Sequence, residues 1–364
     1  MLHVVFPKLF QNSNCLIKFK SLSTIIPNSL FPNSLMQDSP ITSTVDFDRD
    51  GVQHGFLKLP HSHDESAWGS IMIPITVAKN GEGPTILFTG ANHGDEYEGP
   101  VALFDLAHQI KVDELSGRVI IVPGMNYPAF QAGKRTSPID GGNMNRVFPG
   151  DPEGTFTEKI ADYFTRILLP LADYVVDFHA GGKTMEFLPF CCAHVLEDKE
   201  QQARCIDAMK AFNAPNSVML LEIDAANMYD TTAENMGKVF ISTELAGGGS
   251  TSSYTVGIAK KGIRNILRHA GITKGDLEVS DTLNLDMPDQ RCFVFSETSG
   301  LVEHYIDLGD EVKTGQLIAK VHNIERTGVP PQEYYSGIDG IYMGRHFPGL
   351  ITLGDFLGVV AVPM

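Results

Sequence analysis

Two side chains of the types that bind zinc stand three residues apart in TGANHGDEYEGP, residues 89–100. His93 and Glu96 lie in a glycine-punctuated turn directly after the apolar run PTILF, where charged groups have no packing reason to gather. His179 is placed similarly in VVDFHAGG, after an apolar run and shortly before two glycines. A catalytic zinc uses three protein ligands, commonly imidazole nitrogen and carboxylate oxygen, and keeps one position open. Either histidine alone would be interpreted as structural, but the set predicts one zinc ion per chain.

One carboxylate and two arginines could complete a hydrolytic site. Glu244 in TELAGGG ends another apolar run, where its carboxylate could take a proton from an attacking water; the alternative is a helix cap or an ion pair. Arg135, Asn145 and Arg146 lie in KRTSPIDGGNMNRVFPG, a long segment without helical periodicity. Arginine can stabilise a tetrahedral oxyanion or bind a carboxylate through two hydrogen bonds. The alternative for this segment is a solvated basic loop.

Alternating strands and helices along residues 69–272 would position these side chains. Apolar runs predict strands, and apolar residues at helical spacing predict helices, one of them opened by the capping-box pair Thr155 and Glu158. The predicted strands are 69–78, 84–90, 117–126, 173–182 and 237–249, and the predicted helices are 99–111, 155–172, 201–213 and 253–272. This alternation favours an α/β fold, a mostly parallel sheet with helices on both faces. Ligands of such sheets bind beyond the carboxyl ends of the strands, where the candidate zinc ligands and Glu244 stand.

After about residue 285 the pattern changes to short strands and turns. The stretches 299–321 and 339–361 match each other, each with a glycine, an apolar pair, a central turn and then G-x-x-L or G-x-F-L. This weak repeat predicts two interlocking β-hammerheads and resembles the barrel-sandwich fold of biotinyl and lipoyl domains. The carrier lysine of those domains lies between the halves, but residues 322–338 contain no lysine. We therefore interpret this all-β module as structural.

Charge and cysteine content limit the partners and the compartment. The formal net charge of -16 argues against nucleic acid or an anionic membrane surface as the main partner. The five cysteines are odd in number and show no C-x-x-C spacing, so no disulfide framework is expected, which fits a cytoplasmic protein. No apolar run is long enough to span a bilayer. We expect a small-molecule partner, and the sequence leaves open whether the chain forms a homo-oligomer.

The first 35 residues differ in composition from the rest of the chain. They contain three lysines and no acidic residue, with asparagine, serine and proline scattered among apolar residues. We interpret this segment as a leader and expect the working protein to begin near Met36. The predicted division is a leader at 1–35, a catalytic domain with an N-terminal β segment at 36–284, and a β-rich domain at 285–364.

Four segments together resemble the zinc carboxypeptidase superfamily, and more closely its succinylglutamate desuccinylase/aspartoacylase branch. They are H-x-x-E in GANHGDE, the later histidine in DFHAGG, N-x-N-R in NMNRVFPG, and the glutamate before glycines in TELAGGG. The similarity covers about residues 45–364. One departure is that the usual acid of the family's D-x-N-R motif is Asn143 here, with Asp140 three residues earlier.

The resemblance implies a fold like that of zinc carboxypeptidases and a role for each candidate residue. Three residues would bind the zinc ion: His93, Glu96 and His179. Glu244 would act as general base and then as the acid toward the leaving amine. Arg135 would polarise the acyl carbonyl and stabilise the oxyanion. The substrate carboxylate would be held by Asn145 and Arg146.

The resemblance also implies a substrate class, the small N-alpha-acyl amino acids. Acids near the zinc turn and in LLEIDAANMYD would suit a cationic side chain on the substrate; the candidates are Asp95, Glu98, Glu222 and Asp224. One alternative is an aspartoacylase-like or desuccinylase-like amidase for acidic substrates, which would need further cationic groups. A second is a non-enzymatic metal-binding or carrier module. Glu244 and Arg135 argue against an inactive protein, and the missing lysine argues against a carrier.

Overall fold

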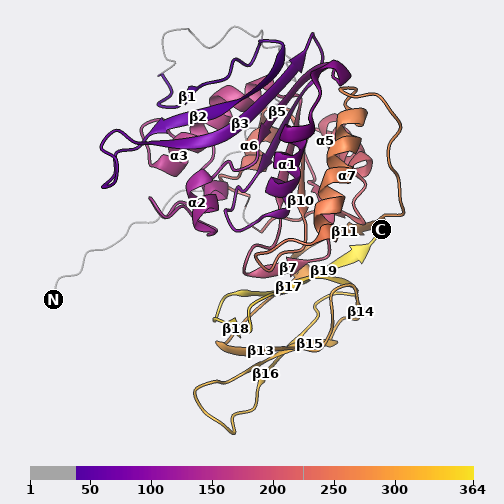
Figure 1. The fold of residues 1–364 in the computed structure, drawn as a ribbon. Helices are drawn as coiled ribbons and strands as arrows, with labels where there is room; N and C mark the ends of the chain where they lie inside the picture. The colour runs from indigo at the N-terminus through magenta and orange to yellow at the C-terminus, as the bar shows by residue number, and fades with distance from the viewer. Residues whose placement is uncertain (1–37, 224) are drawn as a thin grey trace, which may run out of the picture. The chain divides into compact units, whose positions relative to one another are not determined.

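The protein is described by a computed structural model that covers residues 38–223 and 225–364 (Figure 1). Ser39–Met364 form one compact unit. The leader predicted at 1–35 lies outside the described residues. Within the described ranges, no helix is both long and apolar enough to cross a membrane.

Four parallel strands form the centre of a large sheet, in the order β5-β4-β6-β10. They are β4 (Thr85–Gly90), β5 (Gly117–Val122), β6 (Tyr174–His179) and β10 (Val239–Glu244). Each lies within a strand predicted from the sequence, and their side chains are mostly buried because both faces of the sheet are covered. Parallel pairing brings the carboxyl ends of these strands to one edge, where the candidate zinc ligands lie.

Further strands extend the sheet on both sides. β1 (Thr42–Ser43), β2 (Gly51–Pro60) and β3 (Ser70–Asn80) join antiparallel beside β5. Beyond β10 lies β8 (Phe190–Ala193), which is antiparallel to β10, and then β9 (Asn216–Met219), which is parallel to β8. The sheet is therefore mixed, with a parallel centre.

Helices cover both faces of the central strands, as predicted. On one face, α1 (Glu98–Gln109), α5 (Lys199–Phe212) and α7 (Ser253–His269) share an apolar core with the strands, and α7 packs against both α1 and α5 (Figure 1). The other face carries α2 (Tyr127–Ala132), α3 (Phe156–Tyr163), α4 (Leu169–Leu171) and α6 (Tyr229–Asn235). Short 3-10 turns are η1 (Val112–Glu114), η2 (Met144–Arg146) and η4 (Gln290–Cys292).

The helix predicted at 155–172 is interrupted. It begins with the predicted capping box, in which Glu158 N donates to Thr155 Oγ1 at 3.3 Å and Thr155 N donates to Glu158 Oε2 at 2.7 Å. After Tyr163 the chain widens into a π-helical turn, η3 (Phe164–Leu168), before α4. Pro170 gives the reason, because proline has no N–H and its ring would collide with the carbonyl four residues earlier in a regular α-helix.

The C-terminal repeat forms two sheets that exchange short strands. The first half provides β13 (Gly300–His304), β14 (Glu311–Val312) and β15 (Leu317–His322), and the second provides β17 (Gly340–His346), β18 (Leu350–Ile351) and β19 (Phe356–Pro363). β14 pairs with β17 of the second half, and β18 pairs with β13 of the first. The separate antiparallel sheet is β16-β15-β13-β18, where β16 is Gln332–Tyr335. This pairing is the interlocking that the repeat predicts.

The other C-terminal strands continue the large sheet. β11 (Leu283–Asp286) pairs with β9 on one side and with β19 on the other. β19 also pairs with β12 (Phe293–Phe295), and β17 pairs with β7 (Met185–Phe187), which follows the His179 loop. The β-rich segment is thus hydrogen-bonded to β9 and to β7 of the preceding part of the chain. A domain boundary near residue 285 stays a prediction.

Candidate active site

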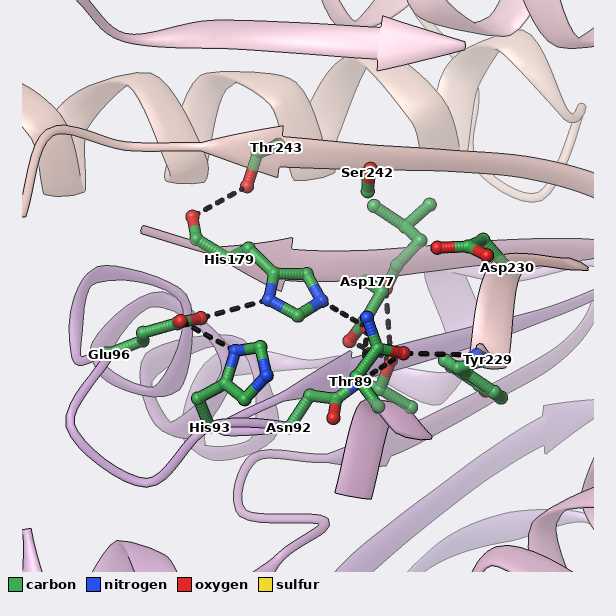
Figure 2. A network of polar contacts seen from close by, with 12 residues as sticks. Thr89, Asn92, His93, Glu96, Asp177, His179, Tyr229, Asp230, Ser242 and Thr243 are labelled. Atoms are coloured by element: carbon green, nitrogen blue, oxygen red, sulfur yellow. Dashed lines mark hydrogen bonds and ion pairs between the residues drawn. The ribbon is translucent and has the colours of Figure 1, made fainter. Parts of the chain in front are cut away.

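Three side chains converge at the carboxyl ends of β4 and β6. His93 and Glu96 come from the turn after β4, and His179 is the last residue of the neighbouring β6. His93 Nδ1 lies 2.7 Å from Glu96 Oε1, and His179 Nδ1 lies 2.9 Å from Glu96 Oε2, so one carboxylate stands between two rings (Figure 2). One ligand atom from each residue lies within 4.8 Å of the others. The three residues form a candidate metal site, as the sequence predicts.

The turn that carries His93 depends on a glycine. A Cβ at Gly94 would lie 2.0 Å from the backbone carbonyl carbon of Ala129, in α2. The glycine therefore lets the turn pack directly against this helix. This close approach explains the glycine immediately after the candidate ligand.

A buried carboxylate behind His179 orients its ring. His179 Nε2 lies 2.8 Å from Asp177 Oδ2, on the opposite side of the ring from Glu96 (Figure 2). Asp177 also accepts hydrogen bonds from Thr89 Oγ1 at 2.6 Å and from Asn92 Nδ2 at 3.1 Å. Such outer carboxylates fix the tautomer of a metal-binding histidine. These partners were not predicted from the sequence, although Asp177 precedes His179 by two residues and so shares its face of the strand.

The charges at the cluster suit a cation. Burial, and then the charge of Arg135, lower the pKa of His93 to about 4, so this ring is neutral at pH 7. Burial alone would raise the pKa of Glu96, but His93 and His179 lower it well below the usual range. Burial alone would lower the pKa of His179, but Asp177 and Glu96 outweigh it and raise the pKa well above the usual value. A metal ion at Nδ1 would take the place of the proton on His179, since metal binding releases protons from its ligands.

Glu244 lies beside this cluster, at the end of the next strand. It is the last residue of β10 and pairs in register with His179. Its Oε2 atom is buried without a hydrogen-bond partner among the described residues. Burial, and then the charge of Glu96, raise the pKa of Glu244 to about 8. A carboxyl group whose pKa lies this close to neutrality can both accept and release a proton.

The predicted catalytic residue Arg135 and the predicted substrate-binding residues Asn145 and Arg146 differ in their contacts. Arg135 Nη1 lies 3.8 Å from Glu96 Oε1, so this arginine reaches the candidate metal site. Asn145 is buried in η2, and its Oδ1 accepts hydrogen bonds from Asn92 Nδ2 at 3.3 Å and from Tyr229 N at 3.0 Å. Arg146 is exposed and donates through Nη1 to Asn145 O at 2.7 Å. The assigned roles of these three residues stay predictions.

The departure from the D-x-N-R motif has a local structural explanation. Asn143 Oδ1 accepts a hydrogen bond from Asn145 N at 3.1 Å and so caps η2. Asp140 instead accepts hydrogen bonds from Thr157 N at 2.7 Å and Gly142 N at 2.9 Å. Asn143 therefore supports Asn145 directly, while Asp140 holds the first turn of α3.

The acids considered as candidate partners of a substrate ammonium have different surroundings where the structure describes them. Asp95 Oδ2 accepts a hydrogen bond from Lys183 N at 2.9 Å and so orders the loop after His179. Glu98 begins α1 with a buried Oε2 that has no hydrogen-bond partner among the described residues, and burial raises its pKa to about 7. Glu222 belongs to a separate cluster with His194. Asp224 lies outside the described residues.

Comparisons with known proteins agree with this geometry. Residues 82–270 match the succinylglutamate desuccinylase/aspartoacylase catalytic domain. The chain is 54% identical over 325 residues to N-alpha-acetyl-L-2,4-diaminobutyric acid deacetylase of Halomonas elongata, covering 89% of this chain and 95% of that protein.

Solved structures show the same relationship. A product-bound structure of the ectoine utilization protein EutE (DoeB) from Ruegeria pomeroyi is 63% identical, with a TM-score of 0.88 over 90% of this chain and 99% of that one. A crystal structure of a succinylglutamate desuccinylase from a Silicibacter species is 58% identical, with a TM-score of 0.87. The match covers 90% of this chain and 100% of that one. The chain therefore belongs to the succinylglutamate desuccinylase/aspartoacylase family.

Proposed function

We propose that the protein hydrolyses the amide of N-alpha-acetyl-L-2,4-diaminobutyrate, releasing acetate and 2,4-diaminobutyrate during ectoine breakdown. The observation that carries this proposal is a carboxylate, Glu244, beside a His-Glu-His cluster in a chain 54% identical to a deacetylase for this substrate. The Ruegeria relative, which takes part in ectoine utilization, has been solved with its product bound. The substrate is thus a small N-acyl amino acid with a cationic side chain.

The donor set of the cluster fits zinc. Two imidazole nitrogens and one carboxylate are a ligand set found in catalytic zinc sites. Both Nδ1 atoms already face the Glu96 carboxylate, and Asp177 fixes the far side of one ring. Zinc held there would act as a Lewis acid, lowering the pKa of a water molecule and polarising the acyl carbonyl.

The chain's own residues would move the protons and hold the substrate. Glu244 would accept the proton of the attacking water and then deliver it to the departing amine, a cycle suited to its raised pKa. Arg135, whose Nη1 is 3.8 Å from Glu96, would donate hydrogen bonds to the oxygen on which negative charge develops. Asn145 and Arg146 would bind the substrate carboxylate.

The competing function is hydrolysis of N-acyl amino acids that carry an acidic group. Such substrates need cationic partners in the pocket, whereas Glu98 adds a second buried carboxyl group near Glu96. This charge balance favours a substrate with an ammonium group. It also makes the charge of the substrate side chain the property to test.

The test is acetate release from three substrates by the purified protein. N-alpha-acetyl-2,4-diaminobutyrate is compared with N-acetyl-2-aminobutyrate, which lacks only the terminal amine, and with N-acetyl-aspartate. We expect kcat/KM to fall by several orders of magnitude for both competitors, because a carboxylate of the site would be left unpaired or repelled. Similar kcat/KM for the neutral analogue, or preference for N-acetyl-aspartate, would overturn the substrate assignment.

A further inference from the structure

A second cluster of metal-binding side chains shares no residue with the catalytic cluster. His194 directly follows β8, Glu222 lies between β9 and α6, and Asp230 and Glu234 belong to α6. We call these four residues the His194 cluster. The side chains of His194, Glu222 and Glu234 are 8%, 14% and 9% exposed, and Asp230 is also buried. Three carboxyl groups and an imidazole are therefore gathered away from bulk water.

The geometry of this cluster resembles a ligand set. One ligand atom each from His194, Glu222 and Asp230 lies within 4.8 Å of the others. His194 Nε2 has no hydrogen-bond partner among the described residues and lies 3.9 Å from Glu222 Oε1. Two ligand atoms that bind one zinc ion at about 2.1 Å are roughly 3.4 Å apart in tetrahedral geometry. Closing the observed gap by about half an ångström would bring the pair to coordination distance.

Glu234 stands where a positioning carboxylate is expected. It lies 2.9 Å from His194 Nδ1 and so directs the unpartnered Nε2 toward Glu222 and Asp230. The same order of groups occurs at the catalytic cluster, where Asp177 contacts one nitrogen of His179 and the other nitrogen faces Glu96. A carboxylate behind a histidine is the usual outer partner of a metal-binding imidazole.

The composition of the cluster also suits a cation. Three carboxyl groups and one imidazole are buried together, and burying groups of one charge costs free energy unless an opposite charge pairs with them. A divalent cation would supply that charge.

We propose that His194, Glu222 and Asp230 form a second divalent-cation site, with Glu234 as the positioning residue. Imidazole together with carboxylates favours zinc or manganese over calcium or magnesium, which prefer oxygen ligands alone. The sequence predicts one zinc per chain, at the catalytic cluster, and this site would be additional. The proposal does not depend on which substrate the enzyme cleaves.

A cation at this site would join three segments next to the substrate-binding region. It would tie β8 and the segment after β9 to α6, whose first residue is Tyr229. Tyr229 N donates to Asn145 Oδ1 at 3.0 Å, so α6 helps to place the predicted carboxylate-binding residue. The role of the ion is therefore structural, and its loss should change stability and KM more than the chemical step.

Metal stoichiometry is the first test. The full chain is stripped with a chelator, equilibrated with excess zinc, freed of unbound ion and analysed by mass spectrometry. We expect two equivalents for the wild type, one each for His179→Ala and His194→Ala, and none for the double variant. His322→Ala is the control, because His322 forms a similar 2.7 Å pair with Glu303 at the surface and should retain two equivalents.

Thermal stability provides a second readout that is separate from activity. In the His179→Ala background, added zinc should raise the Tm, and adding Asp230→Asn should abolish this rise. The near-isosteric variants Asp230→Asn and Glu222→Gln replace His194→Ala if that variant does not fold. A wild-type chain that holds only one equivalent at saturating zinc would overturn the proposal. So would a Glu222→Gln variant with unchanged metal content and a higher KM for the cationic substrate alone, because the cluster would then bind the substrate ammonium.

Discussion

His179 Nε2 lies 2.8 Å from Oδ2 of Asp177, two residues earlier on strand β6. Side chains two residues apart in a strand point to the same face, so regular strand geometry is enough to place the ring beside the carboxylate. Thr89 and Asn92 hold Asp177 from the other side. The orientation of a candidate metal ligand is thus set from within the sheet.

This relationship predicts the effect of Asp177→Asn. The amide keeps the size of the side chain but loses the charge that fixes the histidine tautomer, so zinc affinity should fall by about 10-fold to 100-fold. Competition with a chromophoric chelator measures the change. Asp173→Asn, which removes an exposed acid before the same strand, should leave zinc affinity unaltered. Equal affinity in both variants would mean that Asp177 does not orient the ligand.

Glu244→Gln should separate binding from catalysis. Glutamine preserves the volume but cannot accept the proton, so kcat should fall by about two to four orders of magnitude while zinc content and substrate binding persist. Steady-state kinetics, metal analysis and calorimetric titration with substrate check these expectations. The control is Glu186→Gln on strand β7, which alters a carboxylate paired with Arg345 of β17 and should keep kcat near the wild-type value. Near wild-type turnover of Glu244→Gln would place the general base elsewhere.

Arg146→Ala should raise KM more than it lowers kcat. A group that holds the substrate carboxylate binds ground state and transition state alike, and removing such uniform binding leaves the chemical step largely unchanged. Saturation kinetics with N-alpha-acetyl-2,4-diaminobutyrate measure the two constants. Arg264→Ala, on the exposed side of α7, controls for the loss of a positive charge. A fall in kcat at constant KM would assign Arg146 to the reaction centre instead.

Glu278 should make stability depend on pH in the acid range. The hydrogen bond from Arg264 has the largest effect on its pKa; burial opposes it, but together with the hydrogen bond from Arg268 it lowers the pKa from 4.5 to about 2. A lowered folded-state pKa stabilises the fold above the unfolded value, and this contribution is lost as the pH falls from about 4.5 toward 2. Urea unfolding should show Glu278→Gln to be less stable than the wild type at neutral pH, with the difference shrinking over that range. Glu114→Gln, in a more exposed pair with Lys111, should show a smaller difference.

The residues of the site that could be predicted are marked by short sequence patterns of a few neighbouring residues. His93 and His179 each follow an apolar run and precede glycine, and these strands proved to be neighbours in a parallel sheet. The predicted position of Glu244 follows from the same rule, because β10 pairs with β6 in register. Local patterns suffice here because parallel strands bring their carboxyl ends to one edge.

The parts that could not be predicted depend on contacts between distant segments. Glu222 and Asp230 both lie in LLEIDAANMYD, but no motif links that stretch to His194, and only the fold brings the three residues together. Asp177 had a weak signal in its spacing from His179, but nothing in the sequence distinguishes it from a solvated acid. The π-helical turn was a different case, because Pro170 marks the interruption locally.

The position of β19 also has a consequence for how the chain is made. β19 ends at Pro363, yet it lies between β11 and β17 in the interior of the large sheet. In a chain that folds during synthesis, from its N-terminus onward, all candidate metal ligands would leave the ribosome long before this strand does. Until then β11 and β17 have unpaired edges, which favour aggregation. A nascent chain stalled before Phe356 would therefore contain all its catalytic residues and still be a substrate for chaperones and proteases.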